Sequence, residues 1–521
     1  MLTRVQGDIE RLIRQRVAEH PDSTWLLWER ERYSWAETLS SIQRVSNGLL
    51  DLGVSPGDRV GIVMSNSPEF LWTHFAILFL GALSVPVNTA QRGAALEHVL
   101  RDSGVSLAVI DAPYRDAIRT AMLNCPELRQ LVIVHGVAQS TDERSFGDVA
   151  ASPDLPPEIE VVQSTGGVGI MYTSGTTGPP KGVVSTGYDL TPLAELIGAA
   201  QVRPGETMYT PLPLFHGNAL TVSAIGSIVA DARLALDPKF SASRFWDRCR
   251  EVEAVEFNAL GGMISILLKQ PPRPDDADNP VRRILSAGAP VDRWVEFEQR
   301  FDVKIIEWFG MVDAPGILIN SEGRIGSIGK PVTGLSYRIV DEDDQELPAG
   351  TVGELVFQHE RGQLTKYHND PEATDRAYRS GWFHSGDLAE TDSDGFFYYR
   401  GRKKESMRRR GENISAWEIE AVLNLHPDIQ EAAAFAVPSD IEEDEVMVVV
   451  MLQPGAVLEP GDLLRYCEGR MAHYAIPRYV EFLEELPKTP TQKIEYASLR
   501  RRGIAESTWD REKANHEVRR I

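Results

Sequence analysis

Cysteine is scarce in this sequence of 521 residues, which contains only Cys125, Cys249 and Cys467. These three residues lie too far apart along the chain to form a CxxC pair or a zinc finger. Small secreted proteins, in contrast, are usually rich in cysteine because disulfides stabilise their small cores. The scarcity therefore argues against a disulfide-built scaffold and favours a reducing, cytoplasmic environment.

Long hydrophobic runs and an excess of positive charge are also missing. The most apolar stretch, residues 75–87, contains Gly81 and Pro86 and is shorter than the roughly 18–20 residues that a membrane-spanning helix needs. Residues 1–20 lack the apolar core and cleavage site of a signal peptide. With 54 basic and 76 acidic residues the net charge is −22. Neither nucleic-acid binding nor integral membrane association is expected, and a polyanionic substrate would need a local basic site.

The chain is too long for one compact core, so two or more lobes are expected. Up to about residue 400, short β-branched runs alternate with helical stretches. This pattern is typical of layered α/β subdomains with partly parallel sheets. Residues 75–87 fit a buried helix that runs into a strand.

A charged segment at residues 401–405 precedes a pattern typical of a small α+β unit. Ser415 and Glu418 have the spacing of a capping box at the start of a helix. Further elements are expected at residues 431–437, 446–452 and 478–482 (strands) and 462–471 (helix). We predict an N-terminal domain at residues 1–402 and a C-terminal domain at residues 403–521.

A loop rich in hydroxyl groups and glycine follows the strand-like residues 168–172. Glycines let backbone N–H groups turn toward an anion, hydroxyls add donors, and a lysine adds a full positive charge. The residues suited to hold phosphate are Thr173, Ser174, Gly175, Thr176, Thr177, Gly178 and Lys181. Because Lys181 is followed by Gly182 rather than Ser or Thr, this is not a Walker A motif. Residues 182–185 predict a second strand, so the loop is expected at the tip of a hairpin.

The loop resembles the signature of the adenylate-forming superfamily, which includes acyl-CoA synthetases, carrier-protein adenylation domains and luciferases. Further matching segments occur in the right order over nearly the whole chain. The resemblance implies a large N-terminal lobe of layered α/β subdomains with a small mobile α+β C-terminal domain. It also implies a reaction in which a carboxylate and ATP form an acyl-AMP and pyrophosphate.

The resemblance also assigns residues to the nucleotide. Asp387 and Arg402 occupy the family's ribose positions, where a carboxylate accepts hydroxyl groups and a guanidinium braces ribose or phosphate. The adenine side is matched by Gly288, Ala289, Pro290, Phe309 and Gly310. Taken alone, Asp387 could cap a turn and Arg402 could lie on the surface.

The sequence departs from the family pattern Tyr-Gly-x-Thr-Glu, which here is Phe309-Gly310-Met311-Val312-Asp313. A hydroxyl that would face the α-phosphate has become a methyl at Val312. The acidic side chain of Asp313 is shorter by one methylene, about 1.5 Å. Because Mg²⁺ keeps several waters, Asp313 could still bind it through a water. Slower adenylation is one consequence to test.

The acyl group is expected near His216, which matches the family's aromatic or histidine gate. Its expected neighbours are Asn218, Gly261, Gly262, Trp308 and Met311. Trp308 occupies a position that is often small in aryl-CoA ligases, so its indole could shorten the pocket. It could equally pack beneath the sheet, and His216 could be a structural loop residue.

Three residues are matched to the mobile part of the family's reaction cycle. Lys493 resembles the lysine that bridges the carboxylate and the α-phosphate during adenylation. Lys404 falls at the hinge, and Gly411 falls where a glycine lines the pantetheine path. The alternatives are solvated surface lysines and a glycine that only makes a turn.

The pattern is closest to crotonobetaine/carnitine and medium-chain acyl ligases, and predicts an ATP-dependent carboxylate–CoA ligase. The expected substrates and cofactors are ATP, Mg²⁺, coenzyme A and a small carboxylic acid, with acyl-CoA, AMP and pyrophosphate as products. One alternative is a stand-alone enzyme that loads a carrier protein. Another is a catalytically impaired nucleotide-binding regulatory homologue, motivated by Val312 and Asp313. A homodimer is among the assemblies that the sequence leaves open.

Overall fold

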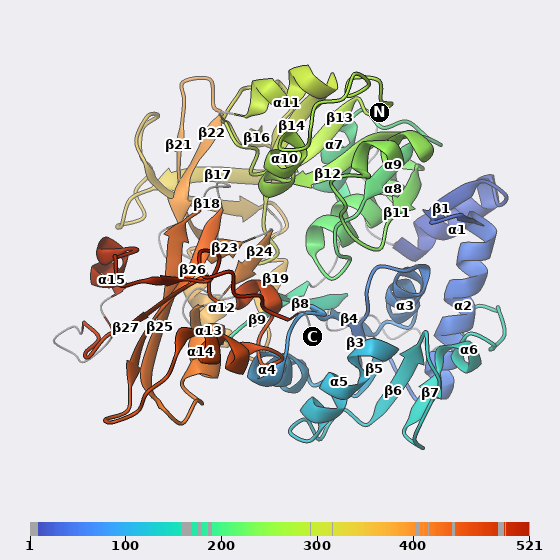
Figure 1. Ribbon diagram of the computed structural model, residues 1–521. Coiled ribbons are helices and arrows are strands. Elements are labelled where there is room, and N and C mark those ends of the chain that lie inside the picture. The colour runs from blue at the N-terminus through green and yellow to red at the C-terminus, as the bar shows by residue number, and fades with distance from the viewer. Residues whose placement is uncertain are drawn as a thin grey trace. The chain divides into compact units, whose positions relative to one another are not determined.

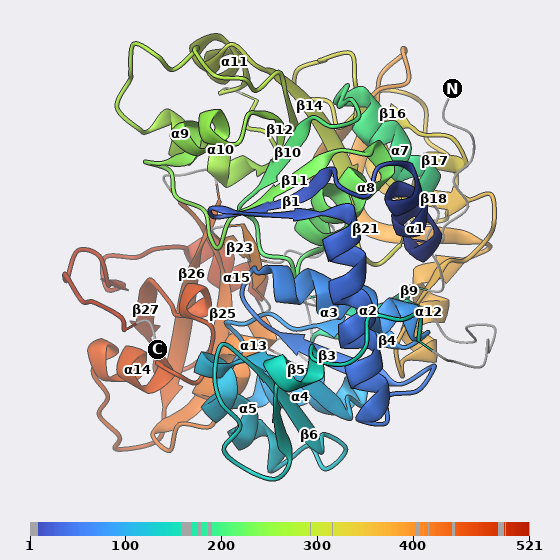
Figure 2. The same cartoon turned by 90° about the vertical axis from the view of Figure 1, so that its right-hand side faces the viewer.

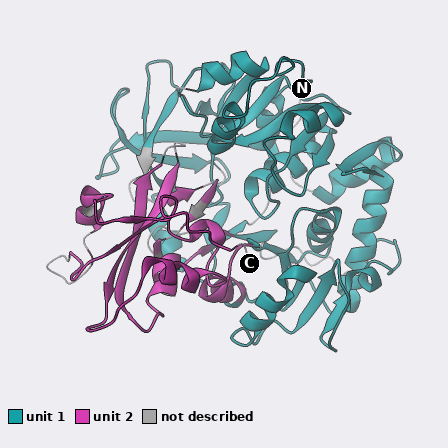
Figure 3. Ribbon diagram, viewed as in Figure 1, with its two compact units in different colours: residues 1–89, 101–171, 182–401 teal, residues 90–100, 172–181, 402–521 magenta. Residues whose placement is uncertain are grey.

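A computed structural model describes residues 9–157, 168–173, 179–185, 190–291, 293–314, 316–402, 407–409, 411–414, 416–439, 443–487, 494 and 496–519. The chain divides into two compact units (Figure 3). Unit 1 comprises residues 1–89, 101–171 and 182–401, and unit 2 comprises residues 90–100, 172–181 and 402–521. The predicted α/β fold class is confirmed, because both units combine sheets with packed helices.

The largest sheet of unit 1 has nine strands in the order β16-β15-β14-β13-β12-β10-β11-β1-β2. Its strands are β1 (Thr24–Trp28), β2 (Glu31–Ser34), β10 (Thr207–Thr210), β11 (Arg233–Leu236), β12 (Ala254–Leu260), β13 (Arg283–Ala287), β14 (Lys304–Gly310), β15 (Ile317–Asn320) and β16 (Lys330–Pro331). Strands β14, β13, β12, β10, β11 and β1 are parallel to their neighbours in this order. Strands β2, β15 and β16 are antiparallel additions at the edges.

Helices cover both faces of this sheet (Figures 1 and 2). One face carries α9 (Phe245–Glu251), α10 (Gly261–Leu268) and α11 (Trp294–Phe301). The other carries α7 (Leu190–Ala199), the π-helix η2 (Asn218–Ile225), α8 (Gly226–Ala230) and α1 (Ile9–Glu19). Because both faces are covered, the central strands are almost entirely buried, as parallel strands usually are.

A second sheet has the order β19-β9-β8-β4-β3-β5-β6-β7. Its strands are β3 (Arg59–Val63), β4 (Leu83–Pro86), β5 (Leu107–Asp111), β6 (Gln130–Val134), β7 (Glu143–Ser145), β8 (Gly169–Thr173), β9 (Lys181–Ser185) and β19 (Thr365–Tyr367). The helices of unit 1 in this part of the chain are α2 (Trp35–Asp51), α3 (Pro68–Phe79), η1 (Ala112–Tyr114), α5 (Arg115–Met122) and α6 (Phe146–Val149). Helix α4 (Gly93–Ser103) begins in unit 2, to which residues 90–100 belong. The expected helix-to-strand passage at residues 75–87 is confirmed by α3 and β4. Ser34 and Glu37 form a reciprocal capping box that begins α2.

A third, five-stranded sheet completes unit 1 with the order β17-β18-β21-β20, and β22 pairs with β21. Its elements are β17 (Leu335–Val340), β18 (Gly353–His359), α12 (Pro371–Ala377), β20 (Tyr378–Arg379), β21 (Trp382–Thr391) and β22 (Phe397–Arg402). Pro371 at the first turn and the side chain of Asp370, which accepts the N–H of Ala373 at 2.8 Å, fix the start of α12.

Unit 2 contains the hairpin β23-β24 and the sheet β25-β26-β27-β28. Its elements are β23 (Met407–Arg409), β24 (Glu412–Ile414), α13 (Ala416–Leu423), β25 (Ile429–Pro438), β26 (Asp444–Leu452), α14 (Pro460–Cys467), η3 (His473–Ala475), β27 (Tyr479–Phe482), α15 (Tyr496–Arg502) and β28 (Trp509–Asp510). The helix expected at residues 462–471 ends at Cys467, because Glu468 leaves the helical conformation with a ψ of 128° and Gly469 follows with a φ of +71°. Ser415, the expected cap, lies outside the described residues.

The three cysteines are buried. No helix within the described ranges is long and apolar enough to cross a bilayer. The predicted domain boundary near residue 403 stays a prediction.

Candidate active site

The turns that follow β12 and β13 lie against each other, because these parallel strands end at the same edge of the sheet. A side chain at Gly261 would overlap the carbonyl oxygen of Gly288. Gly288 has a φ of +87°, a conformation that favours glycine. The structure therefore brings together the segment predicted for the acyl group and the turn predicted for adenine.

A buried carboxylate fixes the turn after β13. Glu307 of β14 is only 4% exposed, and its two oxygens accept the N–H groups of Gly288 at 2.6 Å and Ala289 at 3.0 Å. Hydrogen bonds to an ionised acceptor are stronger than neutral ones. Glu307 was not among the residues predicted from the sequence. The available signal was a charged residue within an otherwise apolar strand.

His216 lies two residues before the eight-residue π-helix η2, a rare element that is often found at functional sites. Its backbone N–H donates to Pro213, and its ring lies 4.7 Å from that of Phe215. A side-chain carbon at Gly217 would lie 3.4 Å from Val312 and 3.8 Å from the sulfur of Met171. The histidine loop therefore adjoins both β8, which leads into the predicted phosphate loop, and the segment that departs from the family pattern.

Trp308 is a core residue of unit 1 and only 8% exposed. A side-chain carbon at Gly310 would lie 2.7 Å from the indole ring, so the glycine leaves space for the ring to lie across the strand. Phe309 points to the opposite face of β14 and packs near Leu318. Met311 packs against a cluster that includes Phe357 and Phe383.

Asp313 is held by β19. The hydroxyl of Tyr367 donates to its carboxylate at 2.8 Å, and the hydroxyl of Thr365 donates to its backbone carbonyl at 2.6 Å. The hydroxyls of Thr365 and Tyr378 lie 2.9 Å apart, and burial raises the pKa of Tyr378. These contacts define the position of a carboxylate that is shorter than the one in the family pattern.

A β-bulge positions Asp387. Between the pairs Glu354–Leu388 and Val356–His384, three residues of β21 lie opposite one residue of β18. Gly386 has a φ of +70°, and its N–H donates to Glu354 at 3.2 Å. Such bulges often redirect a side chain at a functional site.

Ser385 completes this bulge. Its hydroxyl donates to the carbonyl of Leu355 at 2.6 Å and accepts the N–H of Asp387 at 3.0 Å. Asp387 itself is 1% exposed. The predicted ribose ligand is therefore held by a set of local hydrogen bonds.

In unit 2, His98 of α4 lies against both flanks of the predicted phosphate loop. Its Nε2 donates to the carbonyl of Pro180 at 2.9 Å, and its ring meets that of Tyr172 edge-on at 6.4 Å. Thr173 ends β8, and Lys181 begins β9. Neither contact of His98 was predicted from the sequence.

Gly411 lies in the turn between β23 and β24 and has a φ of +80°. Its N–H donates to Glu443 at 3.1 Å. The adjacent Arg409 is buried, forms an ion pair with Glu445 at 2.8 Å, and donates to the carbonyl of Ile476 at 3.0 Å. These contacts anchor the turn that is predicted to line the pantetheine path.

Several predicted residues are not described by the structure. Ser174, Gly175, Thr176, Thr177, Gly178, Lys404 and Lys493 lie outside the described residues, and only the backbone of Arg402 is described, at the end of β22. Their roles stay predictions.

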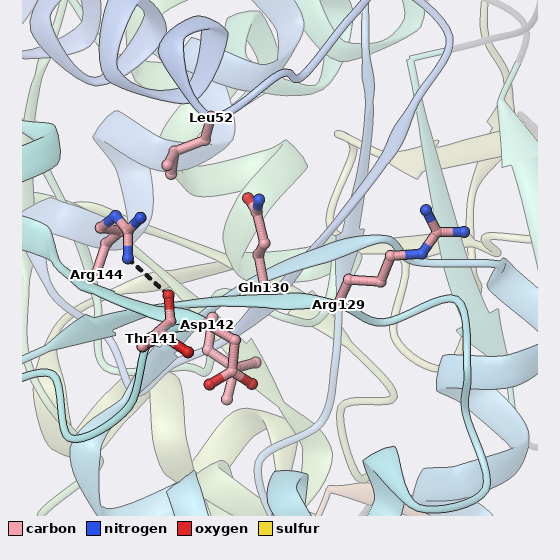
Figure 4. A pocket seen from close by; sticks show the side chains of 7 residues that line it. Leu52, Arg129, Gln130, Thr141, Asp142 and Arg144 are labelled. Atoms are coloured by element: carbon pink, nitrogen blue, oxygen red, sulfur yellow. Dashed lines mark hydrogen bonds between the residues drawn. The ribbon is translucent and has the colours of Figure 1, made fainter.

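Two other features of unit 1 contain none of the predicted residues. Figure 4 shows a pocket of about 190 Å³ at the β6–β7 edge, where Arg144 donates to the carbonyl of Thr141. Glu19, His20 and Asp231 are close enough to hold a metal ion, but Arg16 lies 3.5 Å from the same carboxylate oxygen that His20 contacts. Arg16 already neutralises the carboxylate of Asp231, which argues against a metal ion there. The pocket at the β6–β7 edge is lined by none of the residues predicted for the active site.

Comparisons with known proteins show the family of the chain. Residues 13–367 match the AMP-binding enzyme family, and residues 418–493 match its C-terminal domain. A crotonobetaine/carnitine–CoA ligase from Salmonella agona (strain SL483) is 31% identical over 91% of this chain and 95% of its own length.

Two solved structures share the fold. A mutant o-succinylbenzoate CoA synthetase from Bacillus subtilis has a TM-score of 0.80 at 24% identity, covering 94% of this chain and 97% of that one. A fatty acyl CoA synthetase from Mycobacterium tuberculosis has a TM-score of 0.67 at 26% identity, covering 95% and 98%. The chain belongs to the AMP-binding enzyme family of adenylate-forming proteins.

Proposed function

We propose that the protein is an ATP-dependent carboxylate–CoA ligase. A carboxylate oxygen of the acid attacks the α-phosphorus of ATP and pyrophosphate leaves. The thiol of coenzyme A then attacks the acyl carbonyl, forming the thioester and releasing AMP. The observation that carries the proposal is the meeting of three motif segments at Gly217, which adjoins Met171 before the phosphate loop and Val312 of the 309–313 segment.

Within this reaction, we assign the nucleotide to the segments described above. The turn at Gly288 and Ala289, held by Glu307, would receive the adenine, and Asp387 on its bulge would bind the ribose hydroxyls with Arg402. The phosphate loop with Lys181 would hold the phosphates. These assignments place a carboxylate opposite a diol and cations opposite phosphate.

Mg²⁺ would be held by Asp313. The carboxylate is a suitable oxygen donor, and its bond to Tyr367 fixes it in place. The ion would neutralise charge on the phosphates. Because the side chain of Asp313 is shorter than a glutamate, we expect it to contact Mg²⁺ through a water molecule.

We assign the second half-reaction to a change in position of the C-terminal domain at residues 403–521 relative to residues 1–402. Lys493 would serve adenylation, Lys404 would be the hinge, and Gly411 would line the path of pantetheine. The tether of Gly411 to Glu443 supports a fixed turn there.

The test is detection of acyl-CoA by mass spectrometry after incubation with ATP, Mg²⁺, coenzyme A and a panel of short, branched, aromatic and betaine-type acids. We expect acid-dependent release of pyrophosphate together with a thioester. A thioester found only on added carrier proteins would favour a carrier-loading enzyme, although the similar proteins named above are CoA ligases. Nucleotide binding without acid-dependent pyrophosphate release would favour the regulatory alternative.

We also propose that the protein is located in the cytoplasm and forms a homodimer. The small number of cysteines, three in 521 residues, fits a reducing compartment. Cell fractionation and light scattering on the purified protein test the two points.

A further inference from the structure

A buried carboxylate of the neighbouring strand holds the bulge in β21 that carries Asp387. Glu354 of β18 is 6% exposed, and its Oε1 accepts the N–H of Gly386 at 3.2 Å. The register pairs Glu354 with Leu388, the residue that follows Asp387. The side chain of Glu354 therefore reaches from a regular pair of the sheet back to the middle of the bulge.

The other oxygen of Glu354 lies among basic side chains of the same sheet. Oε2 is 3.7 Å from Nη2 of Arg379 in β20 and 3.4 Å from Nδ1 of His384 in β21. The same Nη2 donates to Nδ1 of His384 at 2.5 Å and lies 3.1 Å from the carboxylate of Asp344. Because a buried carboxylate is costly unless a cation pairs with it, Arg379 stabilises Glu354 in this orientation.

The contact with Gly386 replaces a hydrogen bond that the bulge removes. Residues in a bulge lie outside the regular ladder, so their backbone N–H groups need other acceptors. Glu354 supplies the acceptor for Gly386, and the hydroxyl of Ser385 supplies the one for Asp387 at 3.0 Å. The hydroxyl of Ser385 is itself bonded to the carbonyl of Leu355 at 2.6 Å. Two successive N–H groups are thus held from β18, one of them through a carboxylate.

We propose that Glu354 is a positioning residue that sets the preference for the ribose of ATP by holding Gly386 and, through it, Asp387. The inference rests on the proposed ligase function and on the assignment of Asp387 to the ribose hydroxyls. A carboxylate that accepts both hydroxyls of a diol discriminates against a nucleotide lacking one of them only while it is held in place. Glu354 acts on the nucleotide only through the bulge.

The experiment measures kcat/KM for acid-dependent pyrophosphate release with ATP, 2′-deoxy-ATP and 3′-deoxy-ATP. The unaltered protein should favour ATP over each deoxynucleotide by about tenfold or more, because a site built to bond a hydroxyl rejects the analogue that lacks it. Glu354→Leu keeps a side chain of similar size but removes the acceptor for Gly386. It should reduce both ratios several-fold, mainly through a lower kcat/KM for ATP.

Arg379→Met is the second test variant and keeps the inference testable if Glu354→Leu does not fold. The side chain of Arg379 is 42% exposed, so its replacement leaves no cavity in the core. Glu354 then loses the cation that orients it, and both ratios should fall in the same direction as in Glu354→Leu.

Asp392→Leu is the matched control. Asp392 follows β21, and its carboxylate accepts the N–H groups of Asp394 at 2.9 Å and Phe396 at 3.0 Å. The variant therefore also removes a carboxylate that holds two backbone N–H groups, but at a turn away from the bulge. Its ratios of ATP to deoxynucleotide should equal those of the unaltered protein.

Unchanged ratios in both test variants would overturn the inference, as would an equal fall of kcat/KM for all three nucleotides, which is what a purely structural role of Glu354 predicts. Pyrophosphate release by the unaltered protein without a preference for ATP would remove Asp387 from the ribose and overturn the inference with it. Failure of every nucleotide to release pyrophosphate would instead contradict the proposed ligase function.

Discussion

Asp313 has a shorter side chain than the glutamate that the family pattern places at this position, and two hydroxyl groups of β19 hold it. Thr365 bonds to its backbone and Tyr367 to its carboxylate. The backbone is thus fixed independently of the side chain. A single substitution can therefore separate the orientation of the carboxylate from its presence.

We predict that Tyr367→Phe raises the Mg²⁺ concentration needed for half-maximal pyrophosphate release by about tenfold, because a hydrogen bond to a charged group contributes about 1.5–3 kcal/mol. Tyr337→Phe is the control, since Tyr337 is buried and its hydroxyl has no partner within the described ranges. An unchanged Mg²⁺ requirement in Tyr367→Phe would remove Asp313 from the metal site.

Glu307 makes a second residue-level prediction. Glu307→Gln replaces one of the two oxygens that accept backbone N–H groups with an NH2 donor, so the turn at Gly288 should loosen and KM for ATP should rise about tenfold or more. Glu298→Gln is the control, because Glu298 also accepts a backbone N–H, that of Ile305 at 3.0 Å. The measurement is KM for ATP and KM for the acid in both variants, determined by steady-state kinetics. An equal rise of KM for ATP and for the acid would indicate a general structural role.

Glycines in the turns of the site and residues that hold the site by hydrogen bonds differ in how far the sequence could predict them. Gly261 and Gly288 were predictable, because glycine itself marks close approach or a positive φ. Glu307 was marked only as a charged residue within an otherwise apolar strand, and its role was not predictable because its backbone N–H partners leave no pattern in the side chains. The contact of Tyr367 with Asp313 joins residues 54 positions apart and needed the fold.

At the scale of elements, the bulge in β21 is a device that redirects one side chain. The bulge requires a positive φ at Gly386, which is +70°. No atom lies within 4 Å of a side-chain carbon built at this glycine. Any effect of substitution must therefore come from the backbone rather than from a clash.

We predict that Gly386→Ala loses about 1–2 kcal/mol of stability through backbone strain and also raises KM for ATP, because the bulge carries Asp387. Gly395→Ala should lose similar stability, since Gly395 has a φ of +81° and equally open surroundings, but should leave KM for ATP unchanged. Thermal unfolding and kinetics on both variants are the measurements. If Gly386→Ala loses stability without a change in KM, Asp387 does not bind the nucleotide.

Element boundaries show where sequence patterns stop being informative. Strand β26 was expected because its residues are largely β-branched and apolar. The π-helix was not, because its apolar run has no periodicity that distinguishes it from an α-helix. The two-residue strand β28 is too short for any alternation to be visible.

At the scale of the whole molecule, buried ionisable groups link stability to pH. Burial raises the pKa of Glu256, in the centre of the large sheet, well above its ordinary value. The folded state therefore keeps a proton that the unfolded state loses above about pH 4.5. Between about pH 4.5 and the raised pKa of Glu256 in the folded state, the free energy of unfolding should fall as pH rises, by up to about 1.4 kcal/mol per pH unit for this group.

Glu256→Gln should remove this contribution and make the protein more stable at pH 7, with little difference near pH 4. Urea unfolding of both proteins at several pH values is the measurement. A variant that is less stable at pH 7 would mean that the carboxylate is ionised and paired in the folded state.

We expect the chain to carry out its two half-reactions with different residues. Lys493→Ala tests it most directly, because the lysine is assigned to adenylation alone. The measurement is the rate of acid-dependent pyrophosphate release beside the rate of thioester formation from supplied acyl-AMP and coenzyme A. We predict that the first falls by several orders of magnitude, because a charge at the transition state is lost, while the second survives. Unchanged adenylation, or equal loss of both, would contradict the account.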